Sequence, residues 1–200
     1  MTIIEVGREE TSGLSLRQRW SHYFAILYTI IMVIISLNLR DSILYATIPY
    51  ENTQAGIRVF YPQNWLLDTD GDYVFRVRDM GQRDFKTTIQ VQIIPISSES
   101  TVRNLLDNLA FTRFQVYAAY RQFPRPEITL ADGTIASAVD YTFVFNNTDP
   151  FLESLPSVVV GQDIIVLQRG QAVVISYQAS ADRYDEFYPI FQNFLADMEL

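Results

Sequence analysis

The sequence predicts an α+β fold, with an antiparallel sheet sandwiched by helices, plus one N-terminal transmembrane helix. Residues 20–39 carry no formal charge over about the length that crosses a bilayer. The rest of the chain consists mainly of short runs with strand periodicity and two stretches with helical periodicity. Because 48% of the 200 residues are apolar, the chain has enough material for a core.

The charge and the lack of cysteine exclude several classes of partner and site. The chain has 15 basic and 23 acidic side chains, a formal charge of −8 and no basic cluster in the sequence. Nucleic acid is therefore not an expected partner, since phosphate binding draws on clustered lysine and arginine. Without cysteine there is no thiolate nucleophile, disulfide, iron–sulfur cluster or cysteine-based zinc site.

The uncharged segment is interpreted as a permanent membrane anchor. Phe24 to Leu37 is almost continuously apolar, and Trp20 and Tyr23 precede it as interfacial aromatics do. A cleaved signal peptide is one alternative, but its apolar region usually has about 7–15 residues. Leu44-Tyr45-Ala46 is also a poor cleavage site. A buried core helix is disfavoured because the run is apolar on all faces.

The flanking charges predict the orientation of this anchor. Arg17 and Arg19 immediately precede the segment, whereas the single Arg40 that follows is countered by its acidic neighbour. By the positive-inside rule, residues 1–19 form a cytoplasmic N-terminal segment and residues 40–200 lie outside the cytoplasm. We therefore expect a single-pass protein of the cell inner (plasma) membrane.

Beyond the transmembrane helix at 20–39, residues 40–55 are expected to form a linker and residues 56–200 a single extracytoplasmic domain of ordinary size. The first half of this domain reads as three strands followed by a capped helix. The expected elements are strands at 57–61, 73–78 and 87–94, a turn at Asp70-Gly71 between the first two, and a helix over 102–119 with Ser100 or Thr101 as its N-cap.

The second half of the domain reads as two hairpins and a closing helix. Asp132-Gly133 and Arg169-Gly170 supply the turn signals, because glycine tolerates the left-handed conformation that tight hairpins need. The expected elements are strands at 128–130 and 135–145, strands at 158–168 and 171–179, and a helix over 181–198 with its aromatic residues on one face.

The start of the domain also resembles a known family. Gly56-Ile-Arg-Val-Phe-Tyr-Pro-Gln-Asn-Trp65 is similar to the strand and Tyr-Pro-x-x-Trp motif that begin domains of the PsbP-like class, related to the extrinsic protein of photosystem II. The order of elements that follows is similar too. This resemblance covers residues 56–200 and excludes the anchor. It implies an α/β/α fold and an accessory, assembly or stabilising role in a larger complex.

No catalytic or metal-binding arrangement is expected in the domain. Asp68-Thr-Asp-Gly-Asp72 offers carboxylates that calcium prefers, but its glycine is misplaced for an EF-hand loop, so an acidic turn is the better interpretation. The single histidine, His22, lies in or beside the membrane helix, which leaves no Ser-His-Asp site in the domain. We therefore predict a non-enzymatic protein with no cofactor.

One long loop is a candidate contact surface. Residues 146–157 separate two long strands over about 12 residues, a length that is uncommon unless the loop is functional. Its apolar residues are Phe151, Leu152 and Leu155. They either fold back onto the domain's own core or form a docking tip for a partner or a membrane surface.

These observations favour a non-catalytic accessory subunit that stabilises or helps assemble a larger membrane complex. The resemblance points to an electron-transport or photosynthetic assembly, so the expected partners are membrane-protein subunits and the lipid bilayer. Tyr28, Thr29 and Ser36 are candidate contacts, because membrane helices associate through polar or close-packed side chains. The alternative is a membrane-tethered extracytoplasmic module that binds a small apolar ligand or lipid between sheet and helix.

Overall fold

The computed structural model describes residues 16–44, 46–97, 101–146, 155–168 and 170–199. The chain divides into two compact units, Met1–Ala46 and Thr47–Leu200, and each is described by itself. In the first unit, helix α1 (Leu16–Leu44) extends beyond the predicted 20–39 at both ends. Its stretch Trp20–Arg40 is long and apolar enough to cross a membrane, and none of it is buried. Length and composition fit a membrane anchor or a signal sequence.

The predicted linker at 40–55 is wrong. Helix α1 continues into this range, and strand β1 (Thr47–Asn52) then pairs antiparallel with β2 (Ile57–Pro62). The Asn52 side chain closes the turn by accepting hydrogen bonds from the backbone N–H groups of Gln54 and Ala55, at 3.1 and 3.0 Å. The polar residues of the predicted linker therefore belong to a hairpin turn, since asparagine side chains favour turns through such bonds.

The described residues of the second unit form an eight-stranded, fully antiparallel main sheet. Its order is β3-β4-β5-β10-β9-β8-β6, with β7 paired to β8. The strands are β3 (Leu66–Asp68), β4 (Phe75–Arg78), β5 (Thr88–Pro95), β6 (Ala118–Pro124), β7 (Ile128–Thr129), β8 (Ile135–Phe145), β9 (Ser157–Gln168) and β10 (Gln171–Ser180).

One face of this sheet is closed by helix α3 (Tyr184–Ala196) and the β1–β2 hairpin. Phe75, Ile89 and Tyr177 point to this face from β4, β5 and β10, and each is fully buried. Phe191 and Phe194 of α3 complete the core at 0% and 2% exposure. The predicted aromatic face of the closing helix is confirmed, since its residues pack against this same core.

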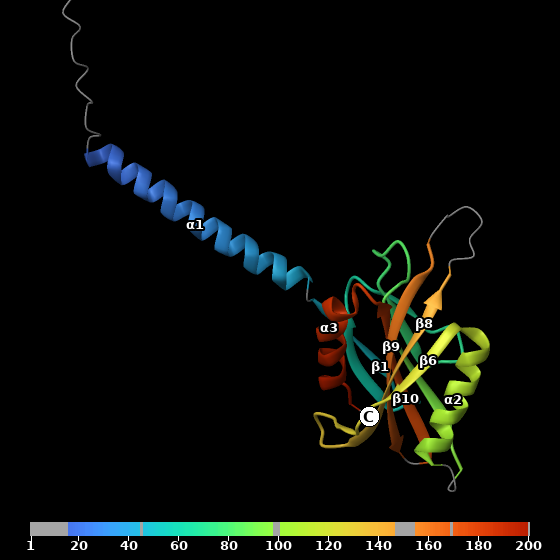
Figure 1. Ribbon diagram of the computed structural model, residues 1–200. Coiled ribbons are helices and arrows are strands. Elements are labelled where there is room, and N and C mark those ends of the chain that lie inside the picture. Colours follow the sequence, from blue (N-terminus) through green and yellow to red (C-terminus); the bar gives the residue numbers. More distant parts are fainter. Residues whose placement is uncertain (1–15, 45, 98–100, 147–154, 169, 200) are drawn as a thin grey trace, which may run out of the picture. The chain divides into compact units, whose positions relative to one another are not determined.

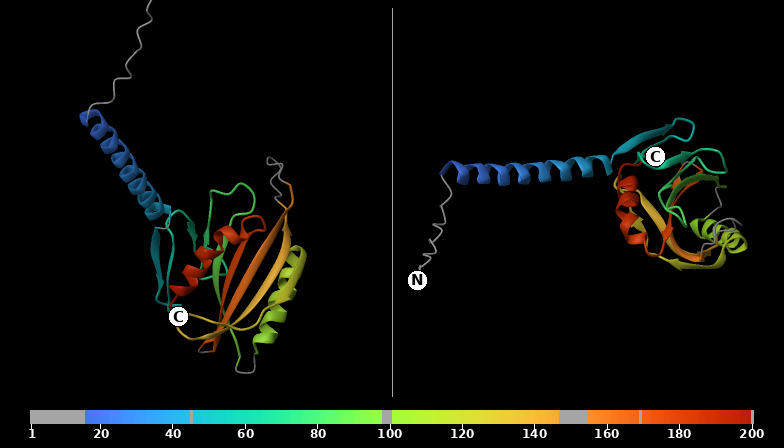
Figure 2. Two further views of the ribbon diagram at one scale, coloured as in Figure 1. Left: turned by 60° about the vertical axis from the view of Figure 1, so that its left-hand side comes forward. Right: turned by 90° about the horizontal axis from the view of Figure 1, so that it is seen from above.

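The opposite face carries helix α2 (Val102–Val116). Leu105 packs with Ile165, Ala172 and Val174 in a second, smaller core. Figures 1 and 2 show α2 and α3 on opposite sides of the sheet. This is the predicted helix–sheet–helix arrangement, and it confirms the α+β fold class.

Helix α2 ends earlier than the predicted residue 119. Tyr117 is already extended, with φ −101° and ψ 128°, and the chain continues as β6 along β8. No glycine or proline stands at this point. The helix therefore ends because the chain pairs with β8, and not because a local residue stops it. The register shifts between Ala118 and Arg121, where Ala119 adopts a left-handed φ of +53°.

The turns were predicted more accurately than the elements they join. Asp70 and Gly71 do lie in a connection, but it joins the unpredicted strand β3 to β4 rather than the first two predicted strands. The hairpins at Gly133 and Gly170 are confirmed. Both glycines have positive φ, +86° and +79°, which explains why glycine occupies these turns.

Candidate functional site

The sheet face beneath α2 carries rows of polar side chains that come from several strands. In the antiparallel register Arg76 lies opposite Gln90, and Gln90 opposite Ser176. Ser176 in turn lies opposite Asp163, so the row crosses four strands. Because alternate residues of a strand share a face, β4 and β5 place a second polar pair, Arg78 and Thr88, beside this row.

Helix α2 is fastened to this polar face by a buried ion pair. Arg113 donates from Nη1 to Asp163 Oδ2 and from Nη2 to Oδ1, the latter at 3.0 Å. Ser176 Oγ also donates to Oδ1 of Asp163, at 2.7 Å. Asp163 is 1% exposed, so these donors replace the water that its carboxylate would otherwise bind.

The charge of Arg113 is maintained by its surroundings. Burial acts to lower its pKa, but the neighbouring Tyr141 and Asp163 outweigh burial and raise the pKa above the ordinary value of arginine. The guanidinium carbon lies 4.3 Å from the centroid of the Tyr141 ring, which adds a cation–π contact. The positive charge therefore stays fixed over the middle of the sheet.

A glycine makes room for this tyrosine. Tyr141 lies opposite Gly161 in the sheet, and a Cβ added at Gly161 would overlap the Tyr141 ring. The Tyr141 hydroxyl accepts a hydrogen bond of 2.8 Å from Gln178 Nε2. Burial raises the pKa of Tyr141 well above its ordinary value, so the hydroxyl stays protonated.

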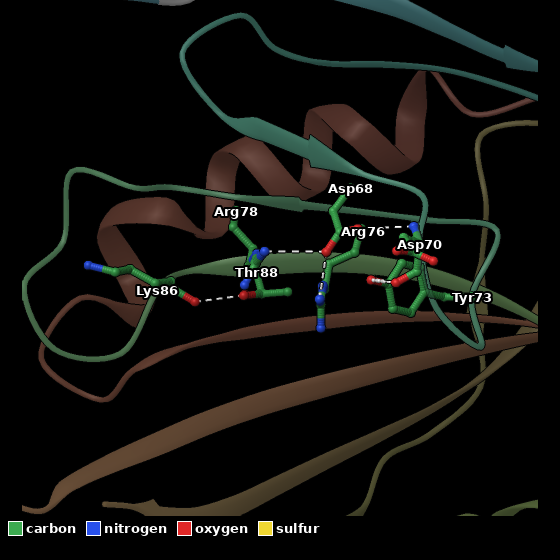
Figure 3. Close-up of polar contacts among 7 residues, drawn as sticks. All are labelled: Asp68, Asp70, Tyr73, Arg76, Arg78, Lys86 and Thr88. Atoms are coloured by element: carbon green, nitrogen blue, oxygen red, sulfur yellow. Dashed lines mark hydrogen bonds and ion pairs between the residues drawn. The ribbon is translucent and has the colours of Figure 1, made fainter. Parts of the chain in front are cut away.

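At the sheet edge two arginines share one carboxylate. Figure 3 shows Arg76 and Arg78 converging on Asp68, whose Oδ2 accepts from Nη2 of each arginine at 2.7 and 3.3 Å. The backbone N–H of Asp70 donates to the other oxygen at 3.0 Å. The hydrogen bond from Arg76, followed by that from Asp70, holds the pKa of Asp68 well below its usual range. Asp68 is thus an arginine partner as well as the start of the predicted acidic turn.

The three arginines described above border a cleft of about 860 Å³ between α2 and strands β4, β5 and β10. Four cationic side chains line the cleft: Arg76, Arg78, Lys86 and Arg113. Its apolar lining includes Leu105, Leu109 and Val116 from α2 and Phe85 and Phe143 from the sheet side. The cleft therefore combines positive charge with apolar surface.

Comparison with solved structures identifies the fold of the second unit. The solution structure of cyanobacterial PsbP (CyanoP) from Synechocystis sp. PCC 6803 matches with a TM-score of 0.55 and 18% identity, covering 78% of this chain and 92% of that one. The domain has a PsbP-like fold. No family model and no curated protein sequence matches the chain.

Two other solved structures share the fold of this PsbP-like domain. The Ran-binding protein Mog1p of Saccharomyces cerevisiae has a TM-score of 0.51 and 13% identity, over 78% of this chain and 95% of that one. LpqN, involved in cell envelope biogenesis of Mycobacterium tuberculosis, has a TM-score of 0.52 and 12% identity, over 76% and 89%. At such identities the likeness concerns the fold of the PsbP-like domain alone.

Of the residues predicted as partner contacts, those that the structure describes are not among the residues that line the cleft. Tyr28, Thr29 and Ser36 are exposed on α1, where Thr29 Oγ1 donates to the Ala25 carbonyl at 2.8 Å. Phe151 and Leu152 lie outside the described residues. Leu155, just before β9 of the PsbP-like domain, is 88% exposed, so it does not fold back onto the core.

Sequence reasoning missed the arginines of the cleft and one polar group in α1. Arg76 and Arg78 alternate with the buried Phe75 and Val77, and this period of two could have placed both arginines on one face of the sheet. In α1, Asn38 lies within the apolar stretch and donates from Nδ2 to the Ile34 carbonyl at 2.9 Å. Its amide was visible in the sequence but was not singled out.

Proposed function

We propose that this protein is a single-span, non-catalytic accessory subunit of a larger membrane complex, of the electron-transport or photosynthetic class. In this proposal its N-terminus is cytoplasmic and its PsbP-like domain is held outside the inner (plasma) membrane. The subunit stabilises or helps assemble the complex, and its partners are other membrane-protein subunits and the surrounding lipid.

The observation that carries this proposal is the exposed apolar surface of α1. Every residue of its Trp20–Arg40 stretch lies unburied, and water is a poor solvent for such a surface. A bilayer is a suitable environment for this helix, because the backbone N–H and C=O groups of a helix bond to one another and need no water. Only residues 45 and 46 separate α1 from the first strand of the domain, so membrane insertion of α1 would retain the domain close to the membrane.

Two groups of side chains support association with partner subunits. In α1, Asn38 adds an amide to the predicted contacts Thr29 and Ser36, and polar groups of this kind strengthen contacts between helices in lipid. On the domain, Phe111 and Phe114 of α2 are 64% and 70% exposed. Aromatic residues are enriched where proteins meet partners, so these two offer a second contact, on the domain itself.

Exchange of the transmembrane helix tests the proposal most directly. We expect the wild-type chain, extracted in mild detergent, to migrate in a large complex on a native gel. Replacing residues 20–39 with an unrelated transmembrane helix should release it, while insertion and folding of the domain persist. A matched variant in which only Thr29 and Ser36 become alanine should show partial release. A wild-type chain that runs alone would contradict the accessory role.

The orientation and retention of the helix are tested separately. Protease added outside intact cells, with the outer barrier opened, should digest the domain and spare a tag fused before residue 1. Protection of the domain would reverse the orientation. A mature protein that begins near Thr47 would show that the segment is a signal peptide, and the proposed anchoring would then be wrong.

The second candidate function is a membrane-tethered binding module, and the cleft between the sheet and α2 supports it. A receptor of this kind should run alone on the native gel, and its melting temperature should rise with ligand. The subunit proposal predicts migration in a large complex.

A further inference from the structure

We propose that the cleft between α2 and strands β4, β5 and β10 binds a small amphiphilic anion, with a phosphate or carboxylate group held by Arg76, Arg78 and Lys86 and an apolar body held against α2. This site goes beyond the accessory role and does not depend on it. It deepens the alternative of a ligand-binding module by changing the expected ligand from apolar to anionic.

The charge balance at the edge of the cleft favours an anion. Arg76 and Arg78 share the single carboxylate of Asp68, so this group of three keeps one positive charge. The side chains of Arg76 and Arg78 are 29% and 31% exposed. An anion in the cleft can therefore still form charge-assisted hydrogen bonds with their guanidiniums.

Lys86 adds a further charge to the lining of the cleft. In Figure 3 its carbonyl faces Thr88 and accepts a 2.6 Å hydrogen bond from Thr88 Oγ1, and its amine extends away from Arg78. That bond fixes the backbone, while the amine forms no ion pair within the described parts of the chain. Asp84 is the acidic residue in the lining. Together with Asp68 it sets two carboxylates against Lys86 and the two arginines, so one positive charge remains.

The apolar part of the cleft lining suits an apolar body. Leu105 and Leu109 of α2 line it, with Ile94 on the sheet. On the other side Phe143 contributes its ring, which stacks on Tyr117 at 4.0 Å between centroids. A ligand that has only a charged group would leave this apolar surface in contact with water, whereas an amphiphilic ligand covers it.

The size of the cleft fits a small molecule. Its volume of about 860 Å³ lies within the range of roughly 300–1,000 Å³ found for small-molecule sites. The buried ion pair between Arg113 and Asp163 fixes α2 over the sheet, so the two walls are held at a set spacing. Arg113 is therefore a positioning residue for the cleft, and its charge is already matched by Asp163.

Calorimetry on the full chain in phosphatidylcholine nanodiscs tests this proposal, with heats from empty nanodiscs subtracted. The probes are naphthyl phosphate, which has charge and an apolar body, naphthol, which lacks the charge, and inorganic phosphate, which lacks the body. The test variant is Arg78→Gln with Lys86→Gln, which leaves Arg76 on Asp68. The matched control is Arg58→Gln with Arg183→Gln, which removes the same charge from exposed ion pairs elsewhere.

We expect naphthyl phosphate to bind at least about tenfold more tightly than naphthol or inorganic phosphate. It alone has both an anionic group for the cationic side chains and an apolar body for the apolar lining. The test variant should weaken its binding by at least about tenfold, as expected for loss of one charge-assisted hydrogen bond, and the control should not. Equal binding of naphthol would overturn the anionic site. Equal binding of inorganic phosphate would overturn the apolar body, and no binding of any probe would overturn both.

The same anionic group can come from a lipid or from a soluble molecule, and a change of lipid separates these sources. In nanodiscs that contain phosphatidylglycerol, a lipid headgroup already in the cleft should compete with naphthyl phosphate for the wild type. Unchanged affinity would identify a soluble anion as the ligand. The control variant, measured in both lipids, reports any general effect of membrane charge.

Discussion

The two faces of the main sheet differ in how completely they are covered. The face under α3 is built from aromatic and aliphatic side chains that are almost all buried, among them Phe75, Tyr177 and Phe191. The face under α2 carries a smaller apolar core beside Arg76, Gln90 and Gln178 in an open cleft. Because the side chains of one strand alternate between the two faces, a few strands provide a stable core and a charged cleft at once.

The difference shows where stability and binding can be separated. A closed apolar face contributes hydrophobic free energy in proportion to the area it buries. A half-covered polar face contributes less, and its charged groups must be held in place by specific bonds such as that between Arg113 and Asp163. Substitutions on the first face should therefore act on folding, and substitutions around the cleft on both folding and binding.

The largest expected effect belongs to the closed face. Phe191 is fully buried, so Phe191→Ala should lower the free energy of unfolding by about 4 kcal/mol, within the usual range for phenylalanine in a core. Phe111, on the outer side of α2, is 64% exposed, and Phe111→Ala should change stability by less than about 0.5 kcal/mol. Urea unfolding of the full chain in neutral detergent, followed by fluorescence of the buried Trp65, measures both. Similar losses for the two variants would contradict the assignment of the main core.

The next effect concerns the ion pair that fastens α2. Asp163→Asn should cost about 3 kcal/mol, because Arg113 would keep its charge in a largely buried place without a carboxylate partner. Replacing both residues together, as Asp163→Leu with Arg113→Met, should recover much of that loss, since apolar pairs of similar size can replace buried ion pairs. The same urea experiment checks this. A double variant less stable than Asp163→Asn would show that the pair contributes net stability.

A smaller effect is expected where the sheet makes room for Tyr141. Gly161→Ala would place a methyl group against the Tyr141 ring, and relief of such overlap typically costs about 1–3 kcal/mol. The ring must shift beneath Arg113, so naphthyl phosphate binding should weaken as well. Gly81→Ala is the matched control, because Gly81 has ordinary φ and meets only the end of the Asp79 side chain. Unchanged melting temperature and binding in Gly161→Ala would contradict this arrangement.

The closed face could be predicted from the sequence, whereas the polar side chains that line the cleft could not. The strands β9 and β10 and helix α3 follow from local periodicity and from the turn at Gly170, all within a short stretch of chain. The cleft depends instead on which residues become neighbours across strands. Gln90 and Ser176 are far apart in sequence and meet only through the register of β5 and β10, and no local pattern records that register.

The same reasoning explains the individual errors. The segment after Val116 has no helix-stopping residue, and only its pairing with β8 makes it the strand β6. Residues 47–52 read as a linker because Pro49 and Asn52 are common in loops, yet pairing with β2 makes them a strand. The four predicted contact residues that the structure describes, Tyr28, Thr29, Ser36 and Leu155, do not line the cleft, since local apolar or polar character does not show which residues meet across strands.

The smallest effect on stability at neutral pH is expected at Asp68, and its dependence on pH is the sharpest test of the shared carboxylate. Arg76 lowers the pKa of Asp68 in the folded state, so the contribution of this carboxylate to stability is complete above the ordinary value of 3.8. It is lost as the pH falls below that value toward the lower pKa of the folded state. The stability curves of wild type and Asp68→Asn should therefore differ at neutral pH and converge in acid.

The same variant, which is expected to lower stability, should raise the affinity of the cleft for an anion. Without the Asp68 carboxylate, Arg76 and Arg78 lose their shared partner and keep two uncompensated charges, so naphthyl phosphate should bind more tightly at neutral pH. Asp107→Asn, on the exposed side of α2, removes an equal charge and should change neither the convergence in acid nor the affinity. Weaker binding in Asp68→Asn would mean that Asp68 holds the two guanidiniums in their binding geometry, so that its loss disorders the site by more than the freed charge gains.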